Sequence, residues 1–243
     1  MNLFKQYFVW ALSVAAVPVM AQKAMHLKPL KSVAIAIAEP SDICFSASTN
    51  TFFIVSDNGI VFETDADAKI IKQAKEPNCD YEAVFADDQF VYAVDETHRD
   101  IHIYDKISLK PLRTVNVPYS GGRNKGYEAF TFNKSKNIFI VITERNPVTL
   151  FELDADFKAT NHIDLSGIAR DISAATYYND ALWLLSDEDM TLLKINPFTY
   201  EVLAKWALPV INPEGIAFDA QGNLMVTCDD MQRLYYFNNP EKQ

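Results

Sequence analysis

Basic residues are scarce in this 243-residue sequence: 22 lysines and arginines stand against 32 acidic residues, which gives a formal net charge of −10. A chain that binds nucleic acid or a bare anionic membrane by electrostatic attraction needs the opposite balance. The composition therefore argues against both partners, and it is compatible with cation binding. Hydrophobic residues make up 49% of the chain, enough for the core of a single large all-β domain.

Cysteine and histidine are also scarce, and neither forms a recognisable metal-binding motif. Cys44, Cys79 and Cys228 occur singly, without a CxxC pair or a Cys/His cluster, which argues against a structural zinc site. Cys44 and Cys228 lie in apolar segments, so we expect buried thiols there. Of four histidines, only His98 falls in an acidic loop. His98 is either an ordinary surface residue or a general base. With no G-x-S-x-G motif, a Ser-His-Asp triad is not indicated.

Long apolar runs are absent except at the N-terminus, where Lys5 precedes "YFVWALSVAAVPVM" and then Ala21. The run is about 14 residues long, shorter than the ~20 that span a bilayer. Val19-Met20-Ala21 fits a small-x-small cleavage site. We therefore expect residues 1–21 to be an export signal and the mature chain to act outside the cytoplasm, in the periplasm or secreted. The residue directly after the cleavage site is Gln22 and not cysteine, so a lipid anchor is not indicated.

A repeat organises the remaining chain. Related segments begin at residues 41, 82, 128, 173 and 214, at intervals of 41 to 46 residues, a period typical of propeller blades. Each unit has a short strand, a polar turn such as "DAQGN", and a nearly continuous apolar strand such as "FFIVS". A third, alternating strand then ends in Asp or Asn, which suits a turn. Continuous apolar strands indicate sheets covered on both faces.

Four segments between the units read as fourth strands: "KIIKQAK", "PLRTVNV", "ATNHIDL" and "VLAKWAL". The last unit lacks one, and residues 31–38 can supply it, which would close the ring and hide its edges. The sequence therefore predicts an all-β fold, a single five-bladed β-propeller of four-stranded blades over residues 31–243. Residues 22–30 would form a leader.

Acidic residues recur at equivalent positions of the repeat. The first strand of each unit begins at Ser41, Glu82, Glu128, Ser173 or Glu214. The second strand ends at one or two acids: Asp57, Asp95 and Glu96, Glu144, Asp187 and Glu188, or Asp229 and Asp230. Because these strands run antiparallel and the first is innermost, both positions lie at one mouth of the channel. Single acids can simply cap strand ends, but the set would repel and need a counter-charge.

Two counter-charges suit such a mouth. Calcium takes six to eight oxygen ligands in irregular geometry, and the metal-ligand candidates are Glu82, Glu128, Glu214, Asp57, Glu144, Asp187 and Asp229. Alternatively, basic residues of the same segments pair with the acids: Arg123, Lys125, Arg145 and Arg170. Three of these, Arg123, Arg145 and Arg170, are also candidates for ligand binding. Tyr81 and Tyr127 either rim the pocket or pack between blades.

The chain resembles the SdiA-regulated, YjiK-like family of exported β-propellers over nearly its whole length after the signal. The resemblance rests on "EPSDICFSASTNTFFIVSDNG", "DYEAVF", "NKGYEAFTF" with "ITER", "RDISAATYYNDALWLLSDED" and "NPEGIAFDAQGNLMV". It implies a periplasmic or envelope protein, with peripheral association with the cell membrane, and a calcium-type site at the acidic mouth. A more distant similarity is to gluconolactonase, paraoxonase and calcium-dependent phytase propellers, although asparagine ligands expected in those enzymes are acids here.

Two functions are compatible with these features. The first is an exported binding module that holds Ca²⁺ and presents a site for a small molecule or a cell-envelope component. The second is a calcium-dependent hydrolase of an ester, lactone or phosphoester, in which the metal polarises an oxygen and a spare carboxylate acts as the base. The absence of a distinct nucleophile favours the first.

Overall fold

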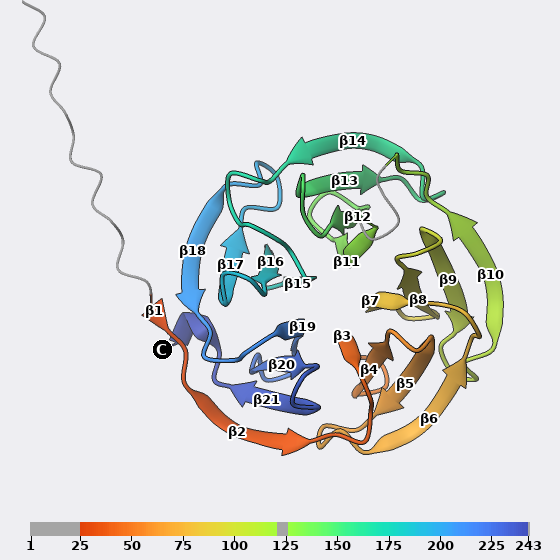
Figure 1. The fold of residues 1–243 in the computed structure, drawn as a ribbon, viewed down its shortest axis with the longest axis horizontal. Coiled ribbons are helices and arrows are strands. Elements are labelled where there is room, and N and C mark those ends of the chain that lie inside the picture. The colour runs from red at the N-terminus through yellow and green to blue at the C-terminus, as the bar shows by residue number, and fades with distance from the viewer. Residues whose placement is uncertain (1–24, 121–125, 243) are drawn as a thin grey trace, which may run out of the picture.

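The computed structural model describes residues 25–120 and 126–242. The strands form five sheets arranged as a ring around a central channel (Figure 1), so the five-bladed β-propeller is confirmed. The expected export signal, residues 1–21, lies outside the described residues, as do Arg123 and Lys125. Among the described residues, no helix has the length and apolar character needed to cross a membrane.

Each blade runs outward from an innermost strand. Blade one contains β3 (Pro40–Ser46), β4 (Thr51–Ser56), β5 (Ile60–Thr64) and β6 (Ile70–Lys75). Blade two contains β7 (Tyr81–Ala86), β8 (Phe90–Asp95), β9 (Asp100–Asp105) and β10 (Pro111–Asn116). Blade three contains β11 (Tyr127–Asn133), β12 (Ile138–Thr143), β13 (Thr149–Leu153) and β14 (Ala159–Asp164).

The last two blades include strands from the beginning of the described chain. Blade four contains β15 (Ala174–Tyr178), β16 (Ala181–Ser186), β17 (Thr191–Ile195), β18 (Val202–Ala207) and, at its outer edge, β1 (Met25–His26). Blade five contains β19 (Pro213–Phe218), β20 (Leu224–Cys228), β21 (Arg233–Phe237) and β2 (Pro29–Ala34). A short 3₁₀ turn, η1 (Pro240–Lys242), follows.

The N-terminal strand closes the ring as expected, but its bounds differ from the predicted 31–38. β2 pairs antiparallel with β21, with Ser32 opposite Tyr235, and it ends at Ala34. Ile35 and Ile37 leave the sheet edge and are buried between blades five and one, so their alternating pattern reflects core packing rather than strand pairing. Part of the expected leader is also ordered, because β1 adds to β18 in parallel.

The second strand of each blade is largely buried and the outermost strand is the most exposed, which explains the hydrophobic pattern of each repeat. Every residue of β16 is buried, whereas β6 alternates between exposed and half-buried positions. Five apolar clusters fill the spaces between neighbouring blades. Between blades four and five, the Trp183 ring lies 5.2 Å from Trp206 and 4.9 Å from Phe218, centroid to centroid. Both Cys44 and Cys228 are buried in these clusters, as expected.

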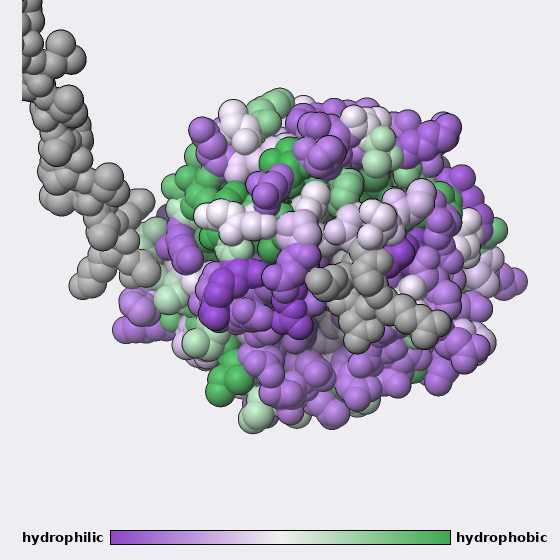
Figure 2. Space-filling model, turned by 45° about the horizontal axis from the view of Figure 1, so that its top comes forward, coloured by the Kyte–Doolittle hydropathy of each residue, from purple (hydrophilic) through white to green (hydrophobic). Residues whose placement is uncertain are grey.

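Polar residues end the third strands and shape the outer turns. The Asp65 carboxylate accepts hydrogen bonds from the backbone N–H groups of Asp67 and Lys69, and Asp154 repeats the arrangement with Asp156 and Lys158. Such side-chain acceptors replace the lost ladder partners at the turn. Figure 2 shows a largely hydrophilic surface on which apolar side chains form smaller patches.

Replacing Ile37 by alanine tests ring closure by the N-terminal segment. Ile37 is 1% exposed and packs with Ile43, Phe52 and Leu234 of blades one and five, so we expect unfolding free energy to fall by about 2–5 kcal/mol in urea titrations. Leu30→Ala is the matched control because Leu30 is 59% exposed, and it should stay within about 0.5 kcal/mol of the parent. Equal effects of the two substitutions would contradict this closure.

Candidate metal centre at one mouth of the channel

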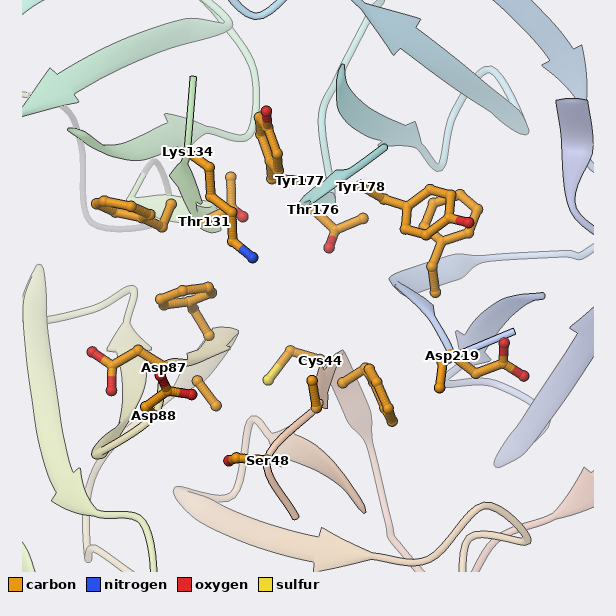
Figure 3. Close-up of a pocket in the computed structure, with 17 residues that line it drawn as sticks. Cys44, Ser48, Asp87, Asp88, Thr131, Lys134, Thr176, Tyr177, Tyr178 and Asp219 are labelled. Atoms are coloured by element: carbon orange, nitrogen blue, oxygen red, sulfur yellow. The ribbon is translucent and has the colours of Figure 1, made fainter. Parts of the chain in front are cut away.

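The two ends of the innermost strands differ in chemistry. Where these strands finish, a cavity of about 470 Å³ is lined by aromatic rings, with the Lys134 side chain pointing into it (Figure 3). In every blade an aromatic residue is the last or the second-last residue of the inner strand: Phe45, Phe85, Phe132, Tyr178 and Phe218. Sequence reasoning did not identify this cavity, although the recurring aromatic position was visible in the repeat. The predicted acids lie where the strands begin, at the other mouth.

The acid that opens an innermost strand occupies a β-bulge. In four blades the register between the first two strands shifts at this position: between Pro40 and Asp42, Tyr81 and Ala83, Tyr127 and Ala129, and Pro213 and Ile216. A bulge leaves its extra residue without a ladder partner and re-aims its side chain. Ser41, Glu82, Glu128 and Glu214 are thereby directed to one shared cavity.

A second set of acids surrounds the same mouth. In every blade the residue directly after the second strand is acidic: Asp57, Glu96, Glu144, Asp187 and Asp229. In blade two, Asp95 is the last strand residue rather than a member of this set. Asp95 is fully buried, and its oxygens accept hydrogen bonds from the backbone N–H and the Nδ1 of His98. Asp95 therefore does not converge with the other acids, and Glu96 takes the equivalent place.

The shared cavity measures about 160 Å³, the size of an ion with its ligands rather than of a large organic molecule. Seven residues line it: Glu39, Ser41, Asp57, Glu82, Glu128, Glu214 and Asp229. Five of the seven predicted metal-ligand candidates are among them. Glu144 and Asp187 are at the same mouth but outside this lining, although their carboxylates act on Glu128 and Glu214 respectively.

Burial and mutual repulsion raise the pKa of these carboxyl groups above the usual range. Burial raises the pKa of Glu82 and of Glu128 well above the usual range, and neighbouring carboxylates raise both further. Burial, followed by Asp187 and Asp229, raises the pKa of Glu214 to about 8. Burial, followed by Glu39, raises the pKa of Asp57 to about 7. The cavity therefore concentrates acidic groups that no lysine or arginine among the described residues pairs with.

Unsatisfied oxygen atoms accompany this charge. The Oδ1 atom of Asp57 is buried and has no hydrogen-bond partner in the described part of the chain. Carboxylate oxygens of Asp80, Glu82 and Glu96 lie within 4.8 Å of one another, close enough to contact a single ion. Among the described residues, none of Glu82, Glu128 and Glu214 forms an ion pair with a lysine or arginine. Hard oxygen donors of this kind suit calcium.

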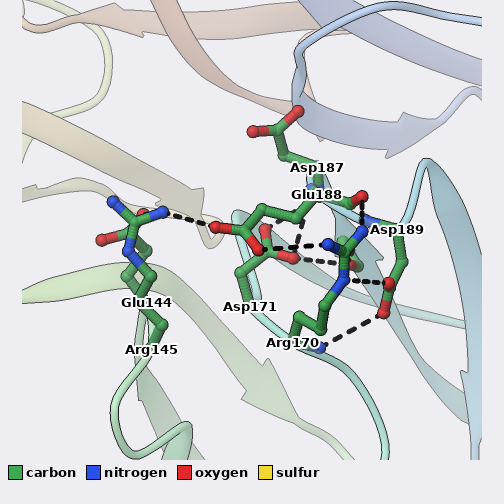
Figure 4. Close-up of polar contacts among 8 residues, drawn as sticks. Glu144, Arg145, Arg170, Asp171, Asp187, Glu188 and Asp189 are labelled. Carbon is green, nitrogen blue, oxygen red and sulfur yellow. Dashed lines mark hydrogen bonds and ion pairs between the residues drawn. The ribbon is translucent and has the colours of Figure 1, made fainter.

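The predicted arginines compensate a different part of the mouth (Figure 4). Arg145 Nη1 lies 3.1 Å from the Glu144 carboxylate and 2.7 Å from that of Glu188. Arg170 Nε lies 2.6 Å from the Asp189 carboxylate, and its guanidinium also contacts Glu188. Both arginines line a cavity of about 320 Å³ beside these acids. The arginine pairing is therefore present, but at the loops of blades three and four.

A buried carboxylate organises the loop that carries these ion pairs. Asp171 is 2% exposed and accepts hydrogen bonds from the Ser186 hydroxyl at 2.5 Å and from the backbone N–H of Asp187 and Glu188. The loop is thus fixed from below, with Glu188 and Asp189 turned toward Arg170 (Figure 4). In this blade Ser173 replaces the inner acid, and its hydroxyl donates to the Pro213 carbonyl instead of facing the cavity.

Tyr81 and Tyr127 are placed between blades and not at the pocket rim. Tyr81 is fully buried, and its hydroxyl lies 2.6 Å from that of Tyr104. Tyr127 is 1% exposed and packs against Tyr119 and Phe151. Each precedes an inner acid in the chain, and the side chains of successive strand residues point in opposite directions. The acid faces the channel, so the tyrosine before it faces the core.

Sequence reasoning missed two acids of this mouth, Glu39 and Asp80, and it left open which of Asp95 and Glu96 belongs to it. Glu39 and Asp80 each lie two residues before a bulge residue, and Asp171 holds the same place in blade four. Counting from the end of the second strand would have chosen Glu96 over Asp95. Gly126 occupies the corresponding place in blade three, where its N–H donates to Glu96 Oε1 at 3.0 Å. A Cβ at Gly126 would lie 2.4 Å from the Glu96 carbonyl oxygen, so glycine is required there.

Comparisons with known proteins agree with this architecture. A family model described as SdiA-regulated matches residues 19–238. No curated protein matches the chain. Among solved structures, the crystal structure of Myxococcus xanthus glutaminyl cyclase is similar, with a TM-score of 0.72 and 15% sequence identity. The similarity covers 89% of this chain and 98% of that chain. At this identity the likeness shows a shared fold alone.

The raised pKa values predict that stability without metal falls as pH rises. Unfolded carboxyls titrate near pH 4, whereas the folded pKa is about 7 for Asp57 and about 8 for Glu214. Between these values the folded protein binds more protons than the unfolded chain, so the free energy of unfolding decreases with pH. We expect the melting temperature of chelator-treated protein to fall from about pH 5 to about pH 8. Glu214→Gln should flatten this decline; a melting temperature that rises over the range would contradict it.

Proposed function

Since this chain belongs to the SdiA-regulated family and forms a propeller with an acidic channel mouth, we propose that it is an exported binding module whose mouth holds calcium. The observation that carries the proposal is the carboxylate-lined cavity. Its buried acids face one another, and among the described residues no lysine or arginine pairs with them. Export to the periplasm or beyond, with peripheral association with the envelope, is part of the proposal.

The donor set supports calcium over other metals. The residues that would hold the ion are Glu82, Glu128 and Glu214 from the bulges, with Asp57, Asp229 and the Ser41 hydroxyl beside them. All offer hard oxygen atoms, which Ca²⁺ prefers, and the cavity has no imidazole or thiol that would favour zinc. A bound cation would supply the missing counter-charge and a partner for the orphaned Asp57 Oδ1. Glu144 and Asp187 would act at longer range.

The ligand site that we propose lies at the loops of blades three and four. Arg145 and Arg170 line a cavity of about 320 Å³ there, together with Asn146 and Ser166. Guanidinium groups bind carboxylate and phosphate groups through paired hydrogen bonds. Both arginines already contact Glu188, so an anionic group would bind by displacing that side chain. A small anionic molecule, free or as part of an envelope component, is the partner that this chemistry favours.

Calcium should stabilise the folded protein, and Glu128→Gln should remove most of that effect. At a free Ca²⁺ concentration of about 100 times Kd, binding contributes about 2.7 kcal/mol, or roughly 5–10 °C in melting temperature for a chain of this size. Because Glu128 is repelled by Glu82 and Glu96, its replacement should also raise the melting temperature measured in chelator. Thermal denaturation with and without Ca²⁺ measures both effects.

Two control variants separate the site from general charge effects. Asp156→Asn removes an acid whose side chain is 80% exposed, and it should leave the calcium response unchanged. Arg145→Gln removes the counter-charge of Glu144 and Glu188, and it too should leave the response in place if calcium binds at the bulges. A parent protein that shows no shift with Ca²⁺ would refute the calcium site.

One observation supports the hydrolase alternative: some carboxylates of the acidic mouth do not line the proposed calcium cavity. Glu144 and Asp187 remain outside it, and burial raises the pKa of each, so either could serve as a base beside a polarised substrate. We expect no chelator-sensitive hydrolysis from a panel of lactones, esters and phosphoesters. Activity that disappears with chelator and with Glu144→Gln, while Asp156→Asn keeps it, would establish the hydrolase instead.

A further inference from the structure

Three potential metal ligands of a different kind meet on blade two. They are Cys79 in the connection between β6 and β7, Asp95 at the end of β8, and His102 in β9, and their ligand atoms lie within 4.8 Å of one another. None of the three lines the acidic cavity. Spacing in the sequence does not reveal them, because they come from three separate elements that the blade brings together.

The separation of the sulfur and nitrogen atoms is close to that of two ligands on one metal ion. Cys79 Sγ lies 3.8 Å from His102 Nε2. With a Zn–S bond of about 2.3 Å and a Zn–N bond of about 2.0 Å, tetrahedral ligands lie about 3.5 Å apart. A shift of a few tenths of an ångström in one side chain would bring the sulfur and nitrogen atoms to this separation.

The surroundings hold the ligands in place. The His98 Nδ1 lies 2.9 Å from Asp95 Oδ2, and the His98 backbone N–H donates to Oδ1. Each carboxylate oxygen has a second lone pair for a further interaction. The His102 ring packs edge-on against Tyr81, with centroids 5.4 Å apart. Carboxylate ligands of metals are commonly oriented by such outer hydrogen bonds.

We propose that Cys79, His102 and Asp95 bind a divalent transition metal ion, with zinc as the best match. A thiolate, an imidazole and a carboxylate form the mixed S, N, O ligand set that zinc accepts, and three protein ligands leave a fourth position open for water or a ligand. Calcium does not favour sulfur or nitrogen donors. On binding, the Cys79 thiol loses its proton to solvent or buffer, and the Zn–S bond replaces the S–H bond.

This zinc site is independent of the proposed calcium site. Cys79 and Asp95 are close in the chain to Asp80 and Glu96, which belong to the acidic mouth, so the two sites must be distinguished by donor type. Excess Ca²⁺ fills oxygen sites without competing for the thiolate. A protein that fails to bind calcium can still bind zinc, and the reverse also holds.

Cobalt substitution provides a direct test. Chelator-treated protein, kept in excess Ca²⁺ and a reductant that does not bind metals, is titrated with Co²⁺. We expect a near-ultraviolet thiolate-to-cobalt charge-transfer band that saturates at one equivalent and is reversed by Zn²⁺. The band should be lost in Cys79→Ser and strongly weakened in His102→Gln. Cys44→Ser is the matched control because Cys44 lines the aromatic cavity at the opposite end of the inner strands, and it should keep the band.

A second measurement uses the unsubstituted protein, so that it does not depend on the folding of any variant. Zn²⁺ should slow alkylation of Cys79 by iodoacetamide at least about tenfold, because a metal-bound thiolate is a poorer nucleophile, whereas Ca²⁺ should not. Peptide mass spectrometry assigns the modified cysteine. The proposal is overturned by a titration without a charge-transfer band, by a band that survives in Cys79→Ser, or by equal alkylation with and without Zn²⁺.

Discussion

Mutual repulsion among buried carboxylates at one mouth of the channel is the constraint on which the properties of this molecule depend. A closed ring brings equivalent positions of all five blades toward one axis. The ring is locked by β2 on β21 and by the apolar clusters between blades, so the acids cannot separate without disrupting this packing. They must therefore take up protons, pair with basic side chains or bind a cation.

The blades meet this constraint in different ways. At the loops of blades three and four, Arg145 and Arg170 neutralise Glu144, Glu188 and Asp189, and in blade four Ser173 replaces the inner acid. The acids that surround the small cavity, which include Glu128 of blade three, form no ion pair with a lysine or arginine among the described residues. The mouth is therefore asymmetric: one part is compensated by the chain, and the other has the donor chemistry of a cation site.

Much of this could be predicted from the sequence, because a repeat of 41 to 46 residues indicates the propeller fold and shows which residues are equivalent from blade to blade. The blades, the closure by the N-terminal strand and the shared mouth of Glu82, Glu128 and Glu214 all followed from it. Single-residue register did not: Asp95 and Glu96 were not distinguished, and two placements of Tyr81 and Tyr127, at the pocket rim or between blades, stayed open. Each of these alternatives depends on a register difference of one residue, which reverses the direction of a strand side chain. Cys79 lies close to His102 because the strands of blade two pair with one another. The spacing of these residues in the sequence does not reveal that pairing.

The central claim is that a cation, and not protonation alone, compensates the acidic cavity. Calorimetric titration of chelator-treated protein with Ca²⁺ near pH 7, repeated in buffers with different ionisation enthalpies, tests it most directly. Since the pKa of Glu214 is about 8 and that of Asp57 about 7, binding should release protons, so the measured heat should depend on the buffer. The account predicts one calcium ion per chain with proton release. No binding at millimolar Ca²⁺, or binding without proton release, would contradict it.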